Sequence, residues 1–163
     1  MATTTMNAGL DAIVGEIEIA APPQRVFQAL IESEQLLRWW GGEGECKAKL
    51  WQVEPRLGGR WRFEGAEKTG KFNINGISEF HADGEIVEFD PPRRLAYTWL
   101  ANWHDDRSRV TLVRWELAPT ENGTRVKVTH SGLAEEPLAR QNYGGGWPEV
   151  LALLKKHCER HES

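Results

Sequence analysis

The sequence predicts an α+β fold in which a curved antiparallel sheet of six to seven strands wraps around a long C-terminal helix. Two observations support this prediction. Several segments alternate apolar and polar residues with a period of two, which is typical of a sheet that buries one face. Near the C-terminus, apolar residues recur at spacings of three and four, which places them in one stripe on a helix: Trp147, Val150, Leu151, Leu154 and Cys158. This stripe is the natural cover for the apolar face of the sheet.

The first half of the chain supplies the start of the sheet and two short helices. Residues 1–10 lack periodicity, and we expect a disordered tail there. A first strand follows, and the double proline after it suits the first turn of a helix. Ser33 is the expected N-cap of a second short helix. The segments assigned here are a strand at 13–20, a helix after Pro22 and Pro23, a helix through Trp40, and a hairpin of strands at 46–53 and 60–64.

The second half supplies the remaining strands and the final helix. The pair Asp83 and Gly84 suggests a bulge or a tight turn within one strand. Residues 132–146 contain three consecutive glycines and are expected to form a long loop, with Pro148 in the first turn of the final helix. The expected strands are residues 77–90, 94–100, 109–119 and 124–130.

Length and charge restrict the class of protein. The chain of 163 residues fits one domain, which we place at residues 11–160. There are 20 Lys and Arg against 24 Asp and Glu, a net charge of -4, and the basic residues are scattered, which argues against nucleic acid as a partner. No apolar run approaches the roughly 20 residues of a membrane span, and the N-terminus lacks a signal-peptide core, so we expect a cytoplasmic protein.

Metal, cofactor and nucleophile chemistry find little support in the sequence. His157 and His161 lie four residues apart beside Cys158, but two ligands near a chain end do not complete a metal site. The glycines at 144–146 lack the Lys-Ser/Thr ending of a phosphate-binding loop, and we interpret them as a flexible lead into the helix. No GxSxG motif is present. We therefore expect no metal and no cofactor.

An ordered set of motifs resembles one known family. It consists of Ala21-Pro22-Pro23, Val26 to Leu30, Trp39-Trp40, Leu57 to Phe63, Pro91 to Leu95 with Thr98-Trp99, Gly123 to Val126, His130 to Leu133 and Gly146-Trp147. Together these motifs resemble the family named after the activator of heat-shock protein 90 ATPase, within the START-like or SRPBCC superfamily. The resemblance covers residues 13–159, and in the eukaryotic activator it is confined to the C-terminal domain. It implies the helix-grip fold of START-like and Bet v-like proteins, with a cavity between sheet and final helix.

The inward-facing aromatic residues are the candidate ligand site. Either these rings fill the core, or they line a pocket for a flat or elongated, lipid-like or aromatic molecule. We adopt the second interpretation, with two helical leucines as the roof. The candidate ligand-binding residues are Trp39, Trp61, Phe63, Tyr97, Trp99, Trp115, Trp147, Leu151 and Leu154.

Two other classes of function remain open. A cyclase-like or hydrolase-like enzyme would use His81 or His130 in a water-poor pocket, with Glu79 or Glu116 as the carboxylate. An interaction domain, associated with a chaperone, would use exposed tryptophans as anchors: Trp40, Trp51 or Trp103. In addition, a glycine-containing loop at 135–146 would gate the cavity, and His104 would lie in a solvated loop.

Overall fold

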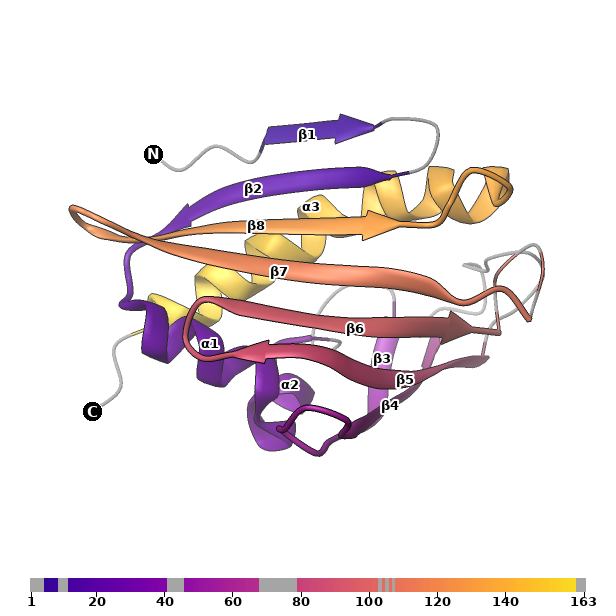
Figure 1. The fold of residues 1–163 in the computed structure, drawn as a ribbon, viewed down its shortest axis with the longest axis horizontal. Coiled ribbons are helices and arrows are strands. Elements are labelled where there is room, and N and C mark those ends of the chain that lie inside the picture. Colours follow the sequence, from indigo (N-terminus) through magenta and orange to yellow (C-terminus); the bar gives the residue numbers. More distant parts are fainter. Residues whose placement is uncertain are drawn as a thin grey trace.

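The computed structural model describes residues 5–8, 12–40, 46–67, 79–102, 104, 106 and 108–160. Within these residues the strands form one antiparallel sheet in the order β1-β2-β8-β7-β6-β5-β4-β3. Figure 1 shows the three helices on the same side of this curved sheet. The structure therefore confirms the predicted α+β helix-grip architecture.

The helices and strands follow the predicted order. The helices are α1 (Pro23–Ile31), α2 (Ser33–Trp39) and α3 (Pro137–Cys158). The strands are β1 (Thr5–Ala8), β2 (Ile13–Ile19), β3 (Cys46–Val53), β4 (Arg60–Glu67), β5 (Glu79–Asp90), β6 (Arg94–Ala101), β7 (Thr111–Thr120) and β8 (Gly123–Ser131).

Strand β1 lies within the stretch for which the sequence predicted a disordered tail. Its backbone pairs with β2 from Thr5 opposite Glu16 to Ala8 opposite Ile13. The pairing extends the sheet to eight strands, one more than predicted. Hydrogen bonds of the backbone form this strand, and they leave no periodic signal in a short polar segment.

Helix α3 is longer than predicted and begins at Pro137. The predicted loop at 132–146, the gate at 135–146 and the placement of Pro148 in the first turn are therefore wrong. Pro148 lies inside the helix, as do the glycines at 144–146. The helix continues because one stripe packs against the sheet along its whole length, and packing outweighs local propensity: Ala139, Tyr143, Trp147, Leu151, Leu154 and Cys158 are all buried.

Two irregularities change which side chains face the helices. In β3 the register shifts between Ala48 and Leu50, so Ala48 and Trp51 are both buried although they lie three residues apart. In β5 the shift falls between Ile86 and Glu88 rather than at Gly84, which pairs regularly with Trp61. The bulge or tight turn predicted at Asp83-Gly84 is therefore wrong, because β5 runs through both residues without a break.

The two ends of the helical layer are tied down by side chains. Arg25 of α1 donates from Nε to the carbonyl oxygen of Cys158 over 2.8 Å and so caps the C-terminus of α3. Ser33 is the first residue of α2 rather than its N-cap, and its Oγ accepts a hydrogen bond from the backbone N–H of Val53.

Among the described residues, no helix is both long and apolar enough to cross a lipid bilayer.

Candidate ligand-binding site

The aromatic residues predicted to face inward are all buried between the sheet and the helices. The most exposed of them is Tyr97, at 8%. Leu151 and Leu154 of α3 lie above the rings and are fully buried. Trp40 and Trp51 join the predicted rings, and we call the whole set the aromatic cluster: Trp39, Trp40, Trp51, Trp61, Phe63, Tyr97, Trp99, Trp115 and Trp147.

Six tryptophans of the aromatic cluster are fixed by a hydrogen bond from the indole N–H. Three donate to backbone carbonyls: Trp39 to Ala29, Trp51 to Trp40 and Trp61 to Thr98, over 2.8–2.9 Å. Three donate to side chains: Trp99 to Tyr143, Trp115 to Tyr97 and Trp147 to His130, over 2.9–3.2 Å. A buried N–H without a partner would cost free energy, so these bonds determine how each ring is oriented.

The indole of Trp40 lies near the centre of the aromatic cluster. Its ring centroid is 4.8 Å from that of Trp51 and between 5.3 and 6.3 Å from those of Trp39, Trp99, Trp115 and Trp147. Trp40 is half-buried, whereas these five neighbours are buried. Its ring occupies space that the resemblance led us to expect as a cavity.

The space on the α2 side of the aromatic cluster is closely packed. The space lined by Leu30, Trp40, Trp61, Ile86 and Tyr97, with their immediate neighbours, holds about 10 Å³. That is about the volume one water molecule needs, whereas pockets for small molecules measure about 300–1,000 Å³. This space, which residues of α1, α2 and β3 to β6 line, is therefore too small for such a molecule.

His130 belongs to a hydrogen-bonded chain inside the core. Its Nδ1 accepts from the indole of Trp147, so the proton of the neutral ring lies on Nε2, 2.8 Å from Thr111 Oγ1. Thr111 in turn donates to the carbonyl oxygen of Trp99. Burial lowers the pKa of His130 to about 3, with a smaller contribution from the charge of His104. Both ring nitrogens are thus satisfied, and the ring stays neutral.

A second polar chain, which the sequence did not predict, runs beside the first. His104 is 2% exposed, so its placement in a solvated loop is wrong. Its Nε2 lies 2.8 Å from the hydroxyl of Tyr143, which also accepts the indole N–H of Trp99. Nearby, the buried carboxylate of Glu136 accepts from Arg109 Nε and from the backbone N–H of Asp106, both over 3.0 Å. The spacing of four between Tyr143 and Trp147 was a signal for the helix, but nothing in the sequence marks His104.

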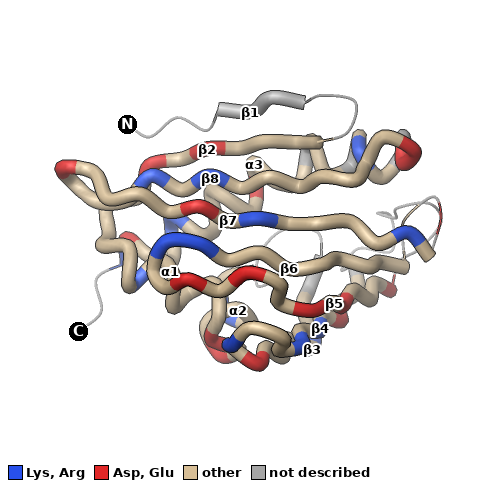
Figure 2. The backbone as a smooth tube through the Cα atoms, viewed as in Figure 1, with Lys and Arg blue, Asp and Glu red and all other residues tan. Residues whose placement is uncertain are grey.

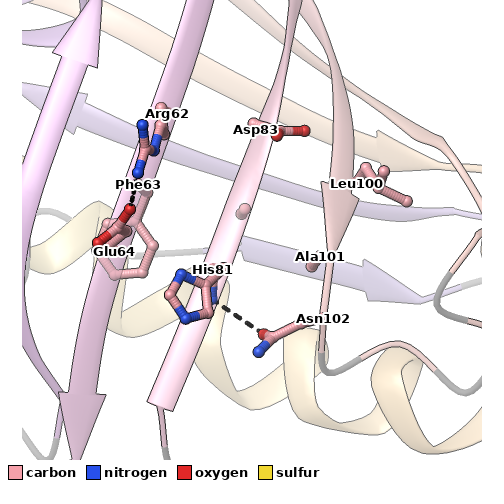
Figure 3. Close-up of a pocket in the computed structure, with 9 residues that line it drawn as sticks. Arg62, Phe63, Glu64, His81, Asp83, Leu100, Ala101 and Asn102 are labelled. Carbon is pink, nitrogen blue, oxygen red and sulfur yellow. Dashed lines mark hydrogen bonds and ion pairs between the residues drawn. The ribbon is translucent and has the colours of Figure 1, made fainter.

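His81 lies on the opposite face of the sheet from the aromatic cluster. It is exposed in a groove of about 400 Å³, and Figure 3 shows it beside Asp83, Asn102 and the ion pair of Arg62 with Glu64. The backbone N–H of His81 donates to Asn102 Oδ1 over 3.0 Å. The hydrogen bond from Arg62 lowers the pKa of Glu64. His81 therefore does not lie in the water-poor pocket expected of an enzyme.

The two candidate carboxylates also face solvent. The side chain of Glu79 is 75% exposed and lies 3.8 Å from Lys49. Glu116 lines a groove on the outer face of the sheet with Arg94 and Lys127, far from the buried face on which His130 lies. Figure 2 shows acidic residues on β2, basic residues on β6 and β8, and both kinds on β7. The structure brings neither candidate histidine together with Glu79 or Glu116 within the core.

Of the two histidines near the C-terminus, the structure describes His157, which takes part in a hydrogen bond inside the protein. His157 is buried, and its Nε2 lies 2.9 Å from Gln35 Oε1. His161 lies outside the described residues. Among the residues that the structure describes, three metal-binding side chains do not come together anywhere.

Of the three tryptophans predicted to be exposed anchors for a protein partner, the structure describes two, and neither is fully exposed. Trp51 is 6% exposed because of the β3 bulge, so its assignment as a surface anchor is wrong. Trp40 is half-buried within the aromatic cluster. Trp103 lies outside the described residues.

A curved sheet that packs an aromatic-rich face against a long C-terminal helix defines the class of START-like, helix-grip domains. Within this class, residues 20–159 match the family described as "Activator of Hsp90 ATPase homolog 1-like protein", and the chain belongs to that family.

Solved structures with the same fold extend over nearly the whole chain. A protein from Mycobacterium smegmatis has a TM-score of 0.75 at 18% identity, with 99% of this chain and 100% of that one covered. A protein from Rhodobacter sphaeroides has a TM-score of 0.74 at 19% identity, with 96% of each chain covered. The solution structure of an AHSA1-like protein from Aeromonas hydrophila has a TM-score of 0.71 at 21% identity, with 93% and 99% covered. No curated protein matches this chain. At these identities, the similarity establishes the fold alone.

Proposed function

We propose that the chain binds a small, flat, hydrophobic molecule between its sheet and α3. The observation that carries this proposal is the aromatic cluster itself, in which rings from α2, four strands and α3 converge on one region. The proposed ligand-binding residues are Trp39, Trp61, Phe63, Tyr97, Trp99, Trp115, Trp147, Leu151 and Leu154.

The chemistry of this region suits such a ligand. Aromatic faces and edges bind flat apolar molecules through stacked and edge-on contacts, each worth about 0.5–1.5 kcal/mol beyond the area buried. Hydrogen bonds already hold six of the indoles in place, so the walls of the site are organised before a ligand binds. Preorganised walls reduce the entropic cost of binding.

The space beside Trp40 holds only about 10 Å³, so a ligand that binds there must replace a protein side chain. Proteins whose binding-competent state is a minor population still bind, with an affinity reduced by the fraction that is competent. We therefore expect modest affinity for simple aromatic probes, and a side-chain rearrangement on binding.

Two-dimensional NMR spectra of ¹⁵N-labelled protein test the proposal. The indole N–H signals are recorded with and without a panel of fatty acids, sterols, flavonoids and flat polycyclic aromatics. Binding at the site shifts the signals of Trp99, Trp115 and Trp147 and leaves backbone signals of the outer-face groove around His81 unchanged. If no indole signal moves with any compound, the rings only fill the core and the proposal fails.

Association with a chaperone is a second candidate function, favoured by the family match over residues 20–159. Its test is the ATPase rate of a purified Hsp90-type chaperone with and without this chain. An increase in that rate supports the association. An unchanged rate together with no capture of the chaperone's middle domain in a pull-down contradicts it.

A further inference from the structure

Trp40 differs from the other tryptophans of the aromatic cluster in how its ring is held. The other six each donate a hydrogen bond from the indole nitrogen. Within the described residues, no hydrogen bond involves Nε1 of Trp40. Trp40 is also half-buried, while the other six are at most 6% exposed. Among the described residues, ring contacts are what hold its side chain, and Trp40 as a residue is partly exposed to solvent.

The backbone of Trp40, in contrast, is fixed at two points. Its N–H donates to the carbonyl oxygen of Leu36 over 2.9 Å, at the end of α2. Its carbonyl oxygen accepts the indole N–H of Trp51 over 2.9 Å. A rotation of the side chain can therefore remove the ring from the aromatic cluster without unfolding α2 or breaking these two hydrogen bonds.

The surroundings of the Trp40 ring define the shape of what could replace it. The rings of Trp39 and Trp99 lie nearly parallel to it, at 26° and 27°. The rings of Trp115 and Trp147 meet it at 78° and 62°. Such surroundings fit a planar group of two fused rings and provide no charged partner for it.

We infer that the indole of Trp40 is an internal occupant of the binding site and that the ligand is a flat, two-ring aromatic molecule that displaces it. This inference rests on the proposed function. Trp40 then controls the affinity of the site, because displacing its ring costs free energy, and this cost weakens the binding free energy of every ligand.

A variant without the indole removes this competition. Trp40→Ala leaves an apolar space comparable with the engineered cavities of about 150 Å³ that stay dry and bind benzene. Leu37→Ala is the matched control. Leu37 lies on α2 beside the buried Leu36, but it is itself 44% exposed and outside the aromatic cluster. The control therefore shortens an apolar side chain on the same helix without opening space among the rings.

The experiment is a calorimetric titration of 2-naphthol into the wild-type chain and both variants. We expect Trp40→Ala to bind 2-naphthol at least about tenfold more tightly than the wild type, and Leu37→Ala to bind like the wild type. In wild-type NMR spectra, we expect the Nε1–H signal of Trp40 to move further on binding than those of the six hydrogen-bonded indoles. If Trp40→Ala does not fold, Trp40→Leu takes its place, since it fills part of the space but lacks the ring.

Failure of the inference and failure of the proposed function give different results in this experiment. Equal or weaker affinity in the Trp40 variant than in the wild type overturns the inference and leaves the proposed function standing. Binding by neither protein, while both are folded, overturns the inference and the proposed function together.

Discussion

The indole N–H of Trp147 donates to Nδ1 of His130 over 3.2 Å and thereby joins α3 to β8 inside the core. The hydrogen-bonded chain continues through Thr111 to the carbonyl oxygen of Trp99. A protonated His130 would carry hydrogen on both nitrogens and could not accept the hydrogen bond from Trp147. The hydrogen bond that joins α3 to β8 therefore requires a neutral imidazole at His130.

The stability of the protein should fall below pH 6.5 through His130. Burial lowers the pKa of His130 to about 3, while in the unfolded chain it is about 6.5. Between these values the unfolded chain binds the extra proton, so acid favours unfolding, by at most about 1.4 kcal/mol per pH unit. Urea unfolding at pH 7.5 and pH 5 measures this loss. His130→Gln keeps an acceptor and a donor but does not titrate, so an equal loss in that variant would rule out His130 as the cause.

Removing the hydroxyl of Tyr97 should destabilise the core. Tyr97→Phe leaves the indole N–H of the fully buried Trp115 without its acceptor, 2.9 Å away in the wild type. An unpaired buried donor costs roughly 1–3 kcal/mol. Thr120→Val is the control, because Thr120 Oγ1 has no hydrogen-bond partner among the described residues. Urea unfolding should separate the two variants, and similar free energies of unfolding would contradict the assignment.

The buried carboxylate at the start of α3 should contribute more to the free energy of unfolding than its exposed neighbour. Glu136 is fully buried and accepts from Arg109 and Asp106, whereas the side chain of Glu135 is 77% exposed. We expect Glu136→Gln to lower the free energy of unfolding by about 1–3 kcal/mol, as for a lost hydrogen bond to a charged group. Glu135→Gln should change it by less than about 1 kcal/mol. Equal thermal shifts for the two variants would argue against this account.

An alanine at position 146 should stabilise the protein, since this residue lies within α3. A Cβ built on Gly146 meets no atom within 4 Å, and alanine favours a helix over glycine by about 1 kcal/mol. Gly84→Ala is the opposite case, because its Cβ would lie 1.8 Å from the carbonyl oxygen of Thr98. The thermal unfolding temperature should rise for the first variant and fall for the second. A fall for Gly146→Ala would place the start of the helix later in the chain.

Much of the fold was predictable because its strands alternate regularly. Trp61 and Phe63 in β4, and Tyr97 and Trp99 in β6, face the helices as their spacing indicated. In these strands, the alternation of apolar and polar residues was therefore enough to predict which side chains are buried, without any knowledge of neighbouring strands.

The errors have local physical causes. The bulge in β3 moves Trp51 to the buried face, and a bulge depends on the partner strand rather than on the residues at the position. Helix α3 passes through Gly144, Gly146 and Pro148 because its buried stripe offsets their low helix propensity. The central place of Trp40 could not be predicted either, since it depends on how α2 meets β3.

A crystal structure of the protein with 2-naphthol would show directly whether a flat hydrophobic molecule binds between the sheet and α3. We expect electron density for the probe among the rings of Trp39, Trp99 and Trp147, with the side chain of Trp40 rotated away. Density for the probe only in the outer-face groove beside His81, with the Trp40 ring unmoved, would contradict it.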